Sequence, residues 1–346
     1  MKDAISYDDV LLTPAYSDIK SRSEVSIETD LGNGLVLELP ILASPMDTIS
    51  ESAMAVEVGR LGGAAVIHRY NTVEMQARQV ELSKEVAKSS HKSTINIGVA
   101  VGVSGDYLER AKSCMDAGAT FICVDVAHGH HIMMKEALSE LRATFGQGLH
   151  IMAGNVATLE GINDLSDWGA DSVRCNIGGG SICSTRIQTG HGLPGLQTIF
   201  DCAQTDRDVT IIADGGIRNS GDMVKALAAG ADVVMCGSLL SGTDESPGKI
   251  FEESDGTRWK SYRGMASKEA QVNWRGKYSS FEGVSTKVPY RGSVRNIIED
   301  LERGIRSGLS YSGARSISEL QTVANFIKQT PAGLGESRTH ILGRQW

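Results

Sequence analysis

The stretch VTIIADGGIRNSGDMVKALAAGADVVMCG, residues 209–237, holds two apolar runs joined by a segment with helical periodicity. The first run, 209–214, ends in an aspartate followed by two glycines, and the second covers 232–237. Both runs are apolar almost throughout, which is typical of parallel strands buried on both faces. The stretch therefore predicts a complete strand–helix–strand unit, with its helix within SGDMVKALAAG (220–230).

The same unit recurs along most of the chain. Three of its helices end in similar letters, DAGAT at 116–120, DWGAD at 167–171 and AAGAD at 228–232. A glycine at the helix end followed by a strand is an economical connection in α/β proteins. Together with the runs above, the expected strands are 39–44, 63–68, 94–101, 120–126, 149–154, 171–177, 209–214 and 232–237.

Eight units over roughly 240 residues match the size of a (β/α)₈ barrel, and an open doubly wound sheet is the competing α/β arrangement. Polar residues follow nearly every predicted strand, which favours the barrel because barrels build their active sites at that end. We therefore predict an α/β fold, a (β/α)₈ TIM barrel with all of 1–346 in one catalytic domain. The polar residues are Ser44, Asp47, His68, Asp125, His128, Asn155, the 178–183 loop, Asp214 to Gly216, Gly237 and Ser238.

Beyond the last predicted strand the pattern changes. Residues 241–292 are rich in Gly, Ser, Lys and Arg and have few hydrophobic runs. Long irregular insertions in compact domains are usually functional, so we expect an active-site flap over 241–292. A helix over 293–307 and a Gly-rich tail are expected to close the domain.

The composition is that of an ordinary globular protein, with 346 residues, 41% hydrophobic and 22% charged. A net charge of -8 argues against broad binding of nucleic acid or anionic membranes, although a local cationic pocket for a small phosphate remains compatible with it. Without a membrane-length apolar run or a signal-peptide pattern, the expected location is cytoplasmic.

One of the six cysteines stands apart from the rest. Cys183 lies in NIGGGSICSTR (176–186), a pliable polar loop, whereas free cysteine usually packs in the interior. Backbone N–H groups and a helix N-terminus can lower a thiol pKa, so this loop favours a reactive thiolate. The expected buried cysteines are Cys114, Cys123, Cys175, Cys202 and Cys236.

Three glycine-rich segments follow the sixth, seventh and eighth strands and read as anion-binding: NIGGGS, ADGGIRNSGD and CGSLLSG. A barrel commonly places its phosphate site in its last βα loops, although a plain turn is the common explanation for any one of them. For Asp214 the pattern leaves two roles open, a helix cap or a hydrogen bond to a ribose hydroxyl.

The motifs SYDDVLLTPAYS, SPMDT, VDVAHGH, AGNVAT, IGGGSICSTR, ADGGIRNSGD, MCGSLLSGTDESPG and YRGMAS resemble the family of IMP dehydrogenases and GMP reductases. The resemblance runs in order from about Tyr7 to His340. It implies a homotetrameric barrel acting on a purine nucleotide, with Cys183 as the nucleophile that attacks C2 of the purine. It also implies nucleotide contacts from Ser44, Met46, Ser181, Asp214, Gly216, Gly237, Ser238, Tyr262, Gly264 and Met265.

The resemblance places a nicotinamide cofactor, NADPH or NAD, against Asp125, Val126, Ala127, Asn155 and Arg174. It further implies a potassium site made by carbonyls of Gly178, Gly180 and Cys183, with Glu336 in the tail GLGESRTH supplied by a neighbouring subunit. The family's usual Gly-Pro-Gly is Gly-Gly-Gly at 178–180, which leaves the need for potassium open. The histidines of VAHGHH lack metal-site spacing and favour a solvated or cofactor-lining loop.

Several features favour the reductase branch of the family. The segment between GMAS and EGVSTKVPYRG is short and has WRGKYSS with no adjacent Arg-Tyr pair. IQTGHG resembles the reductase Lys-Thr-Gly pattern, and the short segment after the second strand leaves no room for a CBS (Bateman) module. We therefore predict NADPH-dependent reductive deamination of GMP to IMP and ammonia, with Thr185 and Glu282 handling ammonia. Because GTDESPG, YRGMAS and AGLGES resemble the dehydrogenases, IMP dehydrogenase stays as the alternative, and a non-catalytic nucleotide-binding homologue as the second.

Overall fold

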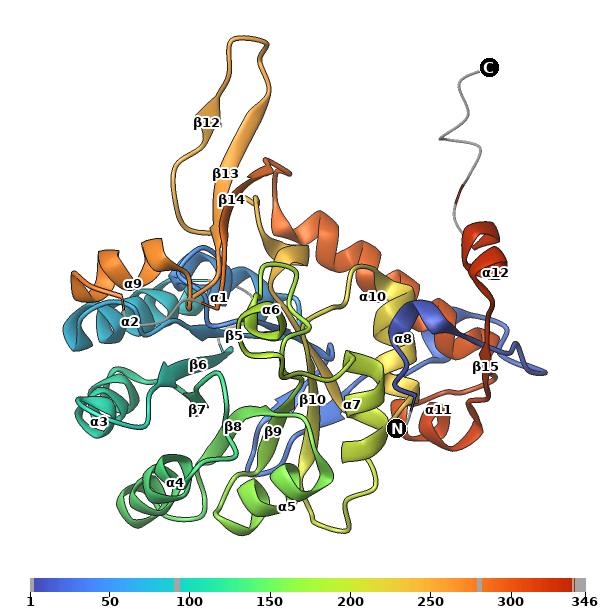
Figure 1. Ribbon diagram of the computed structural model, residues 1–346, viewed down its shortest axis with the longest axis horizontal. Helices are drawn as coiled ribbons and strands as arrows, with labels where there is room; N and C mark the ends of the chain where they lie inside the picture. Colours follow the sequence, from blue (N-terminus) through green and yellow to red (C-terminus); the bar gives the residue numbers. More distant parts are fainter. Residues whose placement is uncertain (1–2, 90–93, 279–281, 338, 340–346) are drawn as a thin grey trace.

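The computed structural model describes residues 3–89, 94–278, 282–337 and 339. Eight parallel strands close into a barrel with helices packed around it, which confirms the (β/α)₈ prediction over the open sheet (Figure 1). All eight predicted strands are present within about two residues of their expected ends. They are β4 (Ile41–Ala43), β5 (Ala64–Ile67), β6 (Asn96–Val101), β7 (Phe121–Asp125), β8 (His150–Val156), β9 (Ser172–Cys175), β10 (Thr210–Asp214) and β11 (Val233–Cys236).

The helices that cover the barrel alternate with these strands. Residues 89–95 alone separate α2 from β6, so no regulatory module is inserted there. No helix among the described residues is long and apolar enough to span a membrane. The covering helices are α1 (Ser52–Arg60), α2 (Val73–Lys88), α3 (Tyr107–Ala117), α4 (Ile132–Phe145), α5 (Leu159–Asp167), α7 (Gly195–Cys202), α8 (Ser220–Ala228), α10 (Val294–Tyr311) and α11 (Ile317–Val323). The short helix α6 (Thr185–Thr189) lies in the connection between β9 and α7.

The interior of the barrel is a packed apolar core. The Phe121 ring fills the space beside Gly98, where a Cβ would lie 2.3 Å from the ring. A small hairpin of β2 (Thr29–Asp30) and β3 (Val36–Leu37) adds its leucines to the same core and closes the N-terminal end of the barrel. The opposite end, where the strands terminate, is left for polar residues and loops.

The three repeated helix endings have a shared geometry. Gly118, Gly169 and Gly230 have φ of 105°, 111° and 116°, a left-handed conformation that favours glycine. The residue two positions later, Thr120, Asp171 or Asp232, uses its side-chain oxygen to accept a hydrogen bond from the backbone N–H of the preceding strand. These bonds come from Ile97 (2.8 Å), Ile151 (2.6 Å) and Ile211 (2.7 Å).

One of these side chains makes stability depend on pH. Burial raises the pKa of Asp232 from 3.8 to about 6, so the folded protein binds this proton more tightly than the unfolded chain does. The Asp232 carboxyl therefore contributes its full stabilisation to the folded state at pH values below its pKa in the unfolded chain. This stabilisation is lost as pH rises through about 6. We expect Asp232→Asn to raise the free energy of unfolding at neutral pH by on the order of 2 kcal/mol.

The asparagine keeps an acceptor for the Ile211 N–H and carries no charge to bury. Urea unfolding at several pH values checks this prediction, because the advantage of the variant should vanish as pH approaches about 4. Parallel stability curves for wild type and variant would contradict it.

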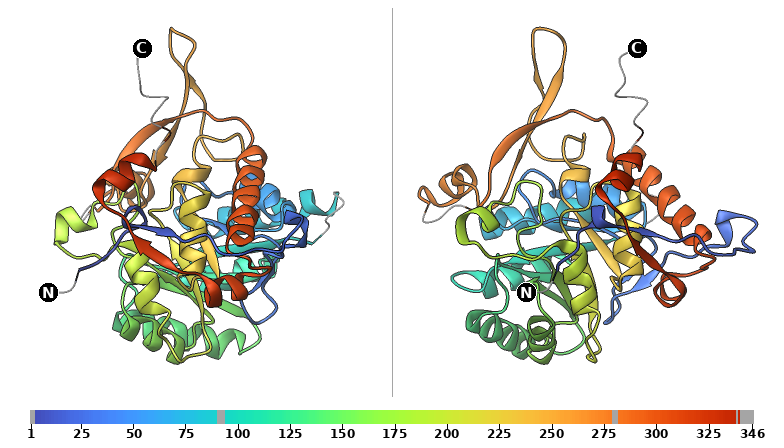
Figure 2. Two further views of the ribbon diagram at one scale, coloured as in Figure 1. Left: turned by 90° about the vertical axis from the view of Figure 1, so that its right-hand side faces the viewer. Right: turned by 45° about the vertical axis from the view of Figure 1, so that its right-hand side comes forward.

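The prediction of an irregular 241–292 segment is wrong. The segment holds a three-stranded antiparallel sheet of β12 (Phe251–Glu252), β13 (Arg258–Arg263) and β14 (Ser285–Pro289), together with helix α9 (Lys268–Arg275). The β12–β13 hairpin stands out from the barrel, and α9 lies beside α2 (Figures 1 and 2). Because the hairpin is largely solvated, its strands lack the apolar runs by which the barrel strands are found.

The two ends of the described chain meet outside the barrel. Strand β1 (Val10–Leu12) pairs antiparallel with β15 (Phe326–Lys328), which leads into α12 (Pro331–Glu336). The sequence analysis expected neither strand, since each has three residues and pairs only over a long sequence separation. The helix expected over 293–307 begins at Val294 and extends to Tyr311.

Candidate active site

We call residues 176–186 the cysteine loop and residues 241–292 the insertion. Backbone hydrogen bonds join the cysteine loop to the insertion. Ser184 donates to the Glu282 carbonyl at 2.8 Å, and Val284 donates to the Ile182 carbonyl at 3.0 Å. These bonds place Cys183 opposite Gly283 as an antiparallel bridge. A segment about 100 positions away in the sequence thus fixes the position of the thiol.

A chain of side-chain hydrogen bonds runs from the thiol into the insertion. The Cys183 thiol donates to Thr185 Oγ1 at 3.2 Å, and the Thr185 hydroxyl donates to Glu282 Oε2 at 2.7 Å. Cys183 is half-buried, whereas the other cysteines are fully buried as expected. The structure thus brings together the three residues that were expected to act in catalysis, and the arrangement can move a proton between sulfur and carboxylate.

Side chains expected to hold the nucleotide converge beside this loop. A Cβ built on Gly237 would lie 3.2 Å from Met46 Sδ, 3.2 Å from Tyr262 Oη and 3.4 Å from Ser44 Oγ. Burial raises the pKa of Tyr262, while hydrogen bonds to Ser181 and Ser238 oppose the rise. The cluster thus combines residues that follow β4 and β11 with residues of the cysteine loop and the insertion.

The remaining expected nucleotide residues lie on the same side. Gly264 packs against the backbone near Cys183: a Cβ built on it would lie 3.4 Å from Gly283 Cα and 3.6 Å from the Ile182 carbonyl oxygen. Met265 Sδ accepts a hydrogen bond from the Asp47 amide at 3.2 Å. Gly216 has φ of 79°, which favours glycine where the loop turns back.

Asn176 braces the glycine loops, a role that the sequence analysis missed. Its amide donates to the Gly215 carbonyl at 3.2 Å. A Cβ on Gly179 would lie only 2.2 Å from Asn176 Nδ2, so this asparagine occupies the space of a side chain at 179. The Gly-Gly-Gly run is therefore braced by a buried amide. Gly180 adds a turn, because its carbonyl accepts from the Cys183 N–H at 3.1 Å.

Tyr7 packs its ring against the turn at Gly216 and the start of α7. Its buried ring lies 3.2 Å from a Cβ position on Gly195 and 3.9 Å from that on Gly216. Burial raises the pKa of the Tyr7 phenol, with Asp222 and Asp214 adding to the rise. The phenol therefore stays neutral at physiological pH, and its role is to pack beneath the glycine turns.

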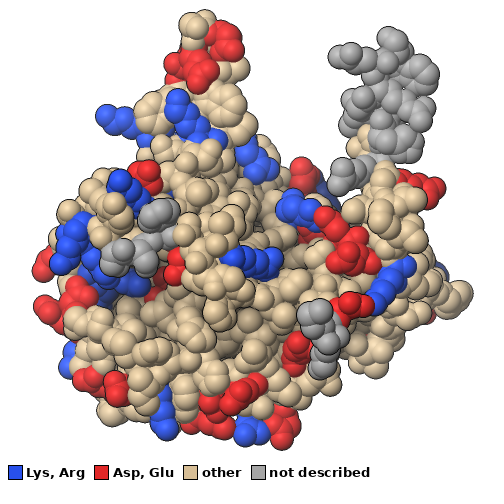
Figure 3. Space-filling view, viewed as in Figure 1, with Lys and Arg blue, Asp and Glu red and all other residues tan. Residues whose placement is uncertain are grey.

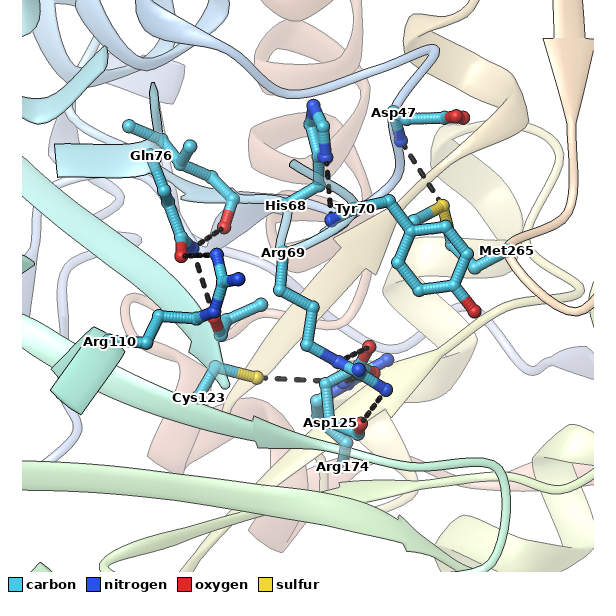
Figure 4. A network of polar contacts seen from close by, with 12 residues as sticks. Asp47, His68, Arg69, Tyr70, Gln76, Arg110, Cys123, Asp125, Arg174 and Met265 are labelled. Atoms are coloured by element: carbon cyan, nitrogen blue, oxygen red, sulfur yellow. Dashed lines mark hydrogen bonds and ion pairs between the residues drawn. The ribbon is translucent and has the colours of Figure 1, made fainter. Parts of the chain in front are cut away.

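Arg174 joins the expected nucleotide side of the site to the cofactor side. Its guanidinium contacts Asp214 at 2.9 Å and Asp125 at 2.5 Å, and Asn155 also donates to Asp214 at 2.8 Å. Burial alone would lower the pKa of Arg174, but the two carboxylates hold it above its ordinary value. Asp214 thus lies at the centre of a buried ion-pair network rather than at a helix end, and Figure 4 shows Arg174 beside Asp125 in this network.

The other expected cofactor residues line one rim. The Asn155 N–H donates to the Val126 carbonyl at 3.0 Å, and Ala127 next to it is exposed. Arg69, which the sequence analysis did not select, donates to the Asp125 carbonyl at 3.1 Å (Figure 4). This rim presents carboxylate, amide and guanidinium groups beside the cysteine loop.

An aromatic and cationic cluster borders the rim. Trp274 of α9 stacks on Tyr70 with ring centroids 4.2 Å apart, and Arg69 lies 5.4 Å from the Trp274 centroid. Arg275 covers Trp274 at 3.9 Å. Figure 3 shows basic side chains gathered on this side of the molecule despite the negative net charge. Part of the WRGKYSS motif, Ser279 and Ser280, lies outside the described residues.

Two of the histidines after β7, His130 and His131, have individual partners. His130 pairs with Asp164 at 2.8 Å, and His131 accepts the Met133 N–H at the start of α4. Within the described part of the chain, no group of three or more His, Cys, Asp or Glu side chains is arranged to hold a metal. Glu336 ends α12 as an exposed residue, and Arg338 and His340 of the tail lie outside the described residues.

Comparison with known proteins agrees with the geometry. The family model for the IMP dehydrogenase / GMP reductase domain matches residues 4–340. Inosine-5'-monophosphate dehydrogenase of Cryptosporidium parvum is 36% identical, covering 97% of this chain and 94% of that protein. The chain belongs to the IMP dehydrogenase / GMP reductase family.

Both branches of the family are represented among its relatives. GMP reductase of Leishmania major is 29% identical, with 99% of this chain and 98% of that protein covered. The crystal structure of a variant GMP reductase from Trypanosoma brucei in complex with guanosine 5'-monophosphate superposes with a TM-score of 0.93 at 29% identity, covering 98% of each chain. Members of this family are oxidoreductases of purine nucleotides, and they use nicotinamide cofactors.

Proposed function

We propose that the protein is a GMP reductase, which converts GMP and NADPH to IMP, ammonia and NADP⁺. The observation that carries the proposal is the Cys183–Thr185–Glu282 chain of hydrogen bonds, at 3.2 Å and 2.7 Å. A reductive deamination needs a nucleophile at C2 and an acid that protonates the departing amine. The similarity to a reductase solved with GMP supports the same choice.

The proposed chemistry follows from these three side chains. The Cys183 sulfur forms a bond to C2 of GMP as its proton passes by way of the Thr185 hydroxyl to Glu282. The C2–N bond then breaks, and Glu282 returns the proton to the amine, which leaves as ammonia. A hydride from the reduced cofactor is added to C2, the C–S bond breaks, and IMP and the thiolate are released. The surrounding loops hold the nucleotide while these bonds change.

The donor set beside the loop fits a nicotinamide cofactor. Asp125 and Asn155 offer a carboxylate and an amide, which suit hydrogen bonds to ribose hydroxyls and to a carboxamide. In this proposal Arg174 keeps Asp214 and Asp125 aligned, and Asp214 accepts from the nucleotide ribose. The cofactor supplies hydride when it is bound. We further propose NADPH over NAD and a homotetramer in the cytoplasm. A potassium site at the carbonyls of Gly178, Gly180 and Cys183, completed by Glu336 of a neighbouring subunit, is also part of the proposal.

Oxidation of IMP by NAD⁺ is the second candidate, because the C. parvum relative is 36% identical and the L. major reductase 29%. The deciding assay follows the absorbance of the reduced cofactor with GMP plus NADPH, and then with IMP plus NAD⁺. We expect consumption in the first mixture and no production in the second. Production only in the second would establish the dehydrogenase, and no change in either would favour the non-catalytic homologue.

A further inference from the structure

A buried ion pair joins the insertion to the segment that follows β4. Arg263, the last residue of β13, donates from Nε to both carboxylate oxygens of Asp47, at 3.2 Å and 3.0 Å, and from Nη2 to Oδ2 at 2.5 Å. Only 9% of the Asp47 side chain and 22% of the Arg263 side chain is exposed. A bidentate pair of this kind fixes orientation as well as distance.

Two further contacts tie the same segments together. The Arg263 N–H donates to Thr48 Oγ1 at 3.2 Å, and the Asp47 N–H donates to Met265 Sδ at 3.2 Å; Figure 4 shows the second of these contacts. Residues 47–48 and 263–265 are therefore joined through side chains and backbone. We call this set of contacts the β4–β13 latch.

The two charged residues of the latch are chain neighbours of residues that converge on the expected nucleotide site. Met46 precedes Asp47 in the chain, and Tyr262 precedes Arg263. Their tips meet at Gly237, where a Cβ would lie 3.2 Å from Met46 Sδ and from Tyr262 Oη. Tyr262 and Arg263 are consecutive residues of β13, so their side chains point to opposite faces of the strand. The ion pair between Arg263 and Asp47 therefore also fixes the direction of the Tyr262 side chain.

We propose that Asp47 and Arg263 are positioning residues that hold the insertion wall of the nucleotide pocket. Neither side chain belongs to the set expected to contact the nucleotide. The inference rests on the proposed function, because it assumes that the pocket takes a purine nucleotide. Without the latch, Tyr262 and Met265 would have to be ordered when the nucleotide binds, which weakens affinity.

The test measures the Kd for GMP by calorimetry in Asp47→Asn, Arg263→Gln and the double variant. We expect each single variant to weaken binding about tenfold, with the double variant no weaker than the worse single one. Hydrogen exchange should accelerate over residues 261–266 in the same variants. Arg263→Lys, which keeps the charge and loses the fork, should weaken binding by a smaller factor.

A matched control is an exposed ion pair on the same sheet, Lys287–Glu253 at 3.9 Å, with 60% and 51% of the side chains exposed. Glu253→Gln should leave the Kd for GMP unchanged. Unchanged affinity in both single latch variants, or additive losses in the double variant, would overturn the latch. Failure of the wild-type protein to bind either GMP or IMP would instead overturn the proposed function.

Discussion

Replacing Cys183 with alanine is expected to lower kcat by roughly 10⁴-fold or more, because removal of a nucleophile abolishes the covalent route. The Kd for GMP should change little, since the convergent pocket residues Ser44, Met46, Tyr262 and Ser238 remain in place. The measurement is NADPH consumption in the presence of GMP, together with nucleotide binding by calorimetry. Trapping of a covalent adduct, detected by mass spectrometry, should be lost in the variant.

A buried cysteine provides the control. Cys114 lies inside α3 and is fully buried, so Cys114→Ala should lower stability through a small cavity and leave kcat nearly unchanged. Turnover by Cys183→Ala within about tenfold of wild type would show that the thiol is not the nucleophile. Equal losses in both variants would point to a general folding defect.

Breaking the proton chain should have the second-largest effect. Glu282→Gln keeps the shape of the side chain and removes the carboxylate that accepts from Thr185 at 2.7 Å, so we expect kcat to fall by about 10²- to 10³-fold. Thr185→Val removes the relay hydroxyl between sulfur and carboxylate and should cost a similar factor. Thr185→Ser restores that hydroxyl and should recover most of the activity.

The control for this prediction lies in the same insertion. Glu269 is an exposed carboxylate in the first turn of α9 and accepts from the Ser285 hydroxyl at 2.9 Å. Glu269→Gln should therefore change kcat by less than about threefold. Steady-state kinetics and release of ammonia from GMP check the series. Full activity of Glu282→Gln, or failure of Thr185→Ser to recover activity, would contradict the relay.

The barrel could be predicted because its signals are local. Apolar runs and helical periods mark the strands and helices, and the glycines of 116–120, 167–171 and 228–232 mark the turns between them. The reactivity expected for Cys183 also had a local sign, a thiol among glycines and hydroxyl residues. Strands β12 to β14 gave no such sign, since a solvated hairpin needs no apolar run.

The partners in the site could not be found in this way. Arg174 bridges two carboxylates about 40 and 50 positions away, and Arg263 reaches Asp47 more than 200 positions away. Asn176 beneath Gly179, and Trp274 against Tyr70, likewise depend on how loops from different strands approach each other. A side-chain contact of this kind leaves no periodic pattern in the chain.

The sequence by itself determined the order of strands and helices, the polar end of the barrel and the family to which the chain belongs. Those features follow from the hydrophobic period, from turn chemistry and from contiguous motifs, all of which are read over a few residues. The resemblance already named Thr185 and Glu282 as a pair, but only the tertiary structure decided how the Cys183 thiol, Thr185 and Glu282 are hydrogen-bonded. It alone also decided that Arg263 pairs with Asp47. Barrel closure brings distant loops to one rim, and the geometry of that rim depends on the packing of every strand beneath it.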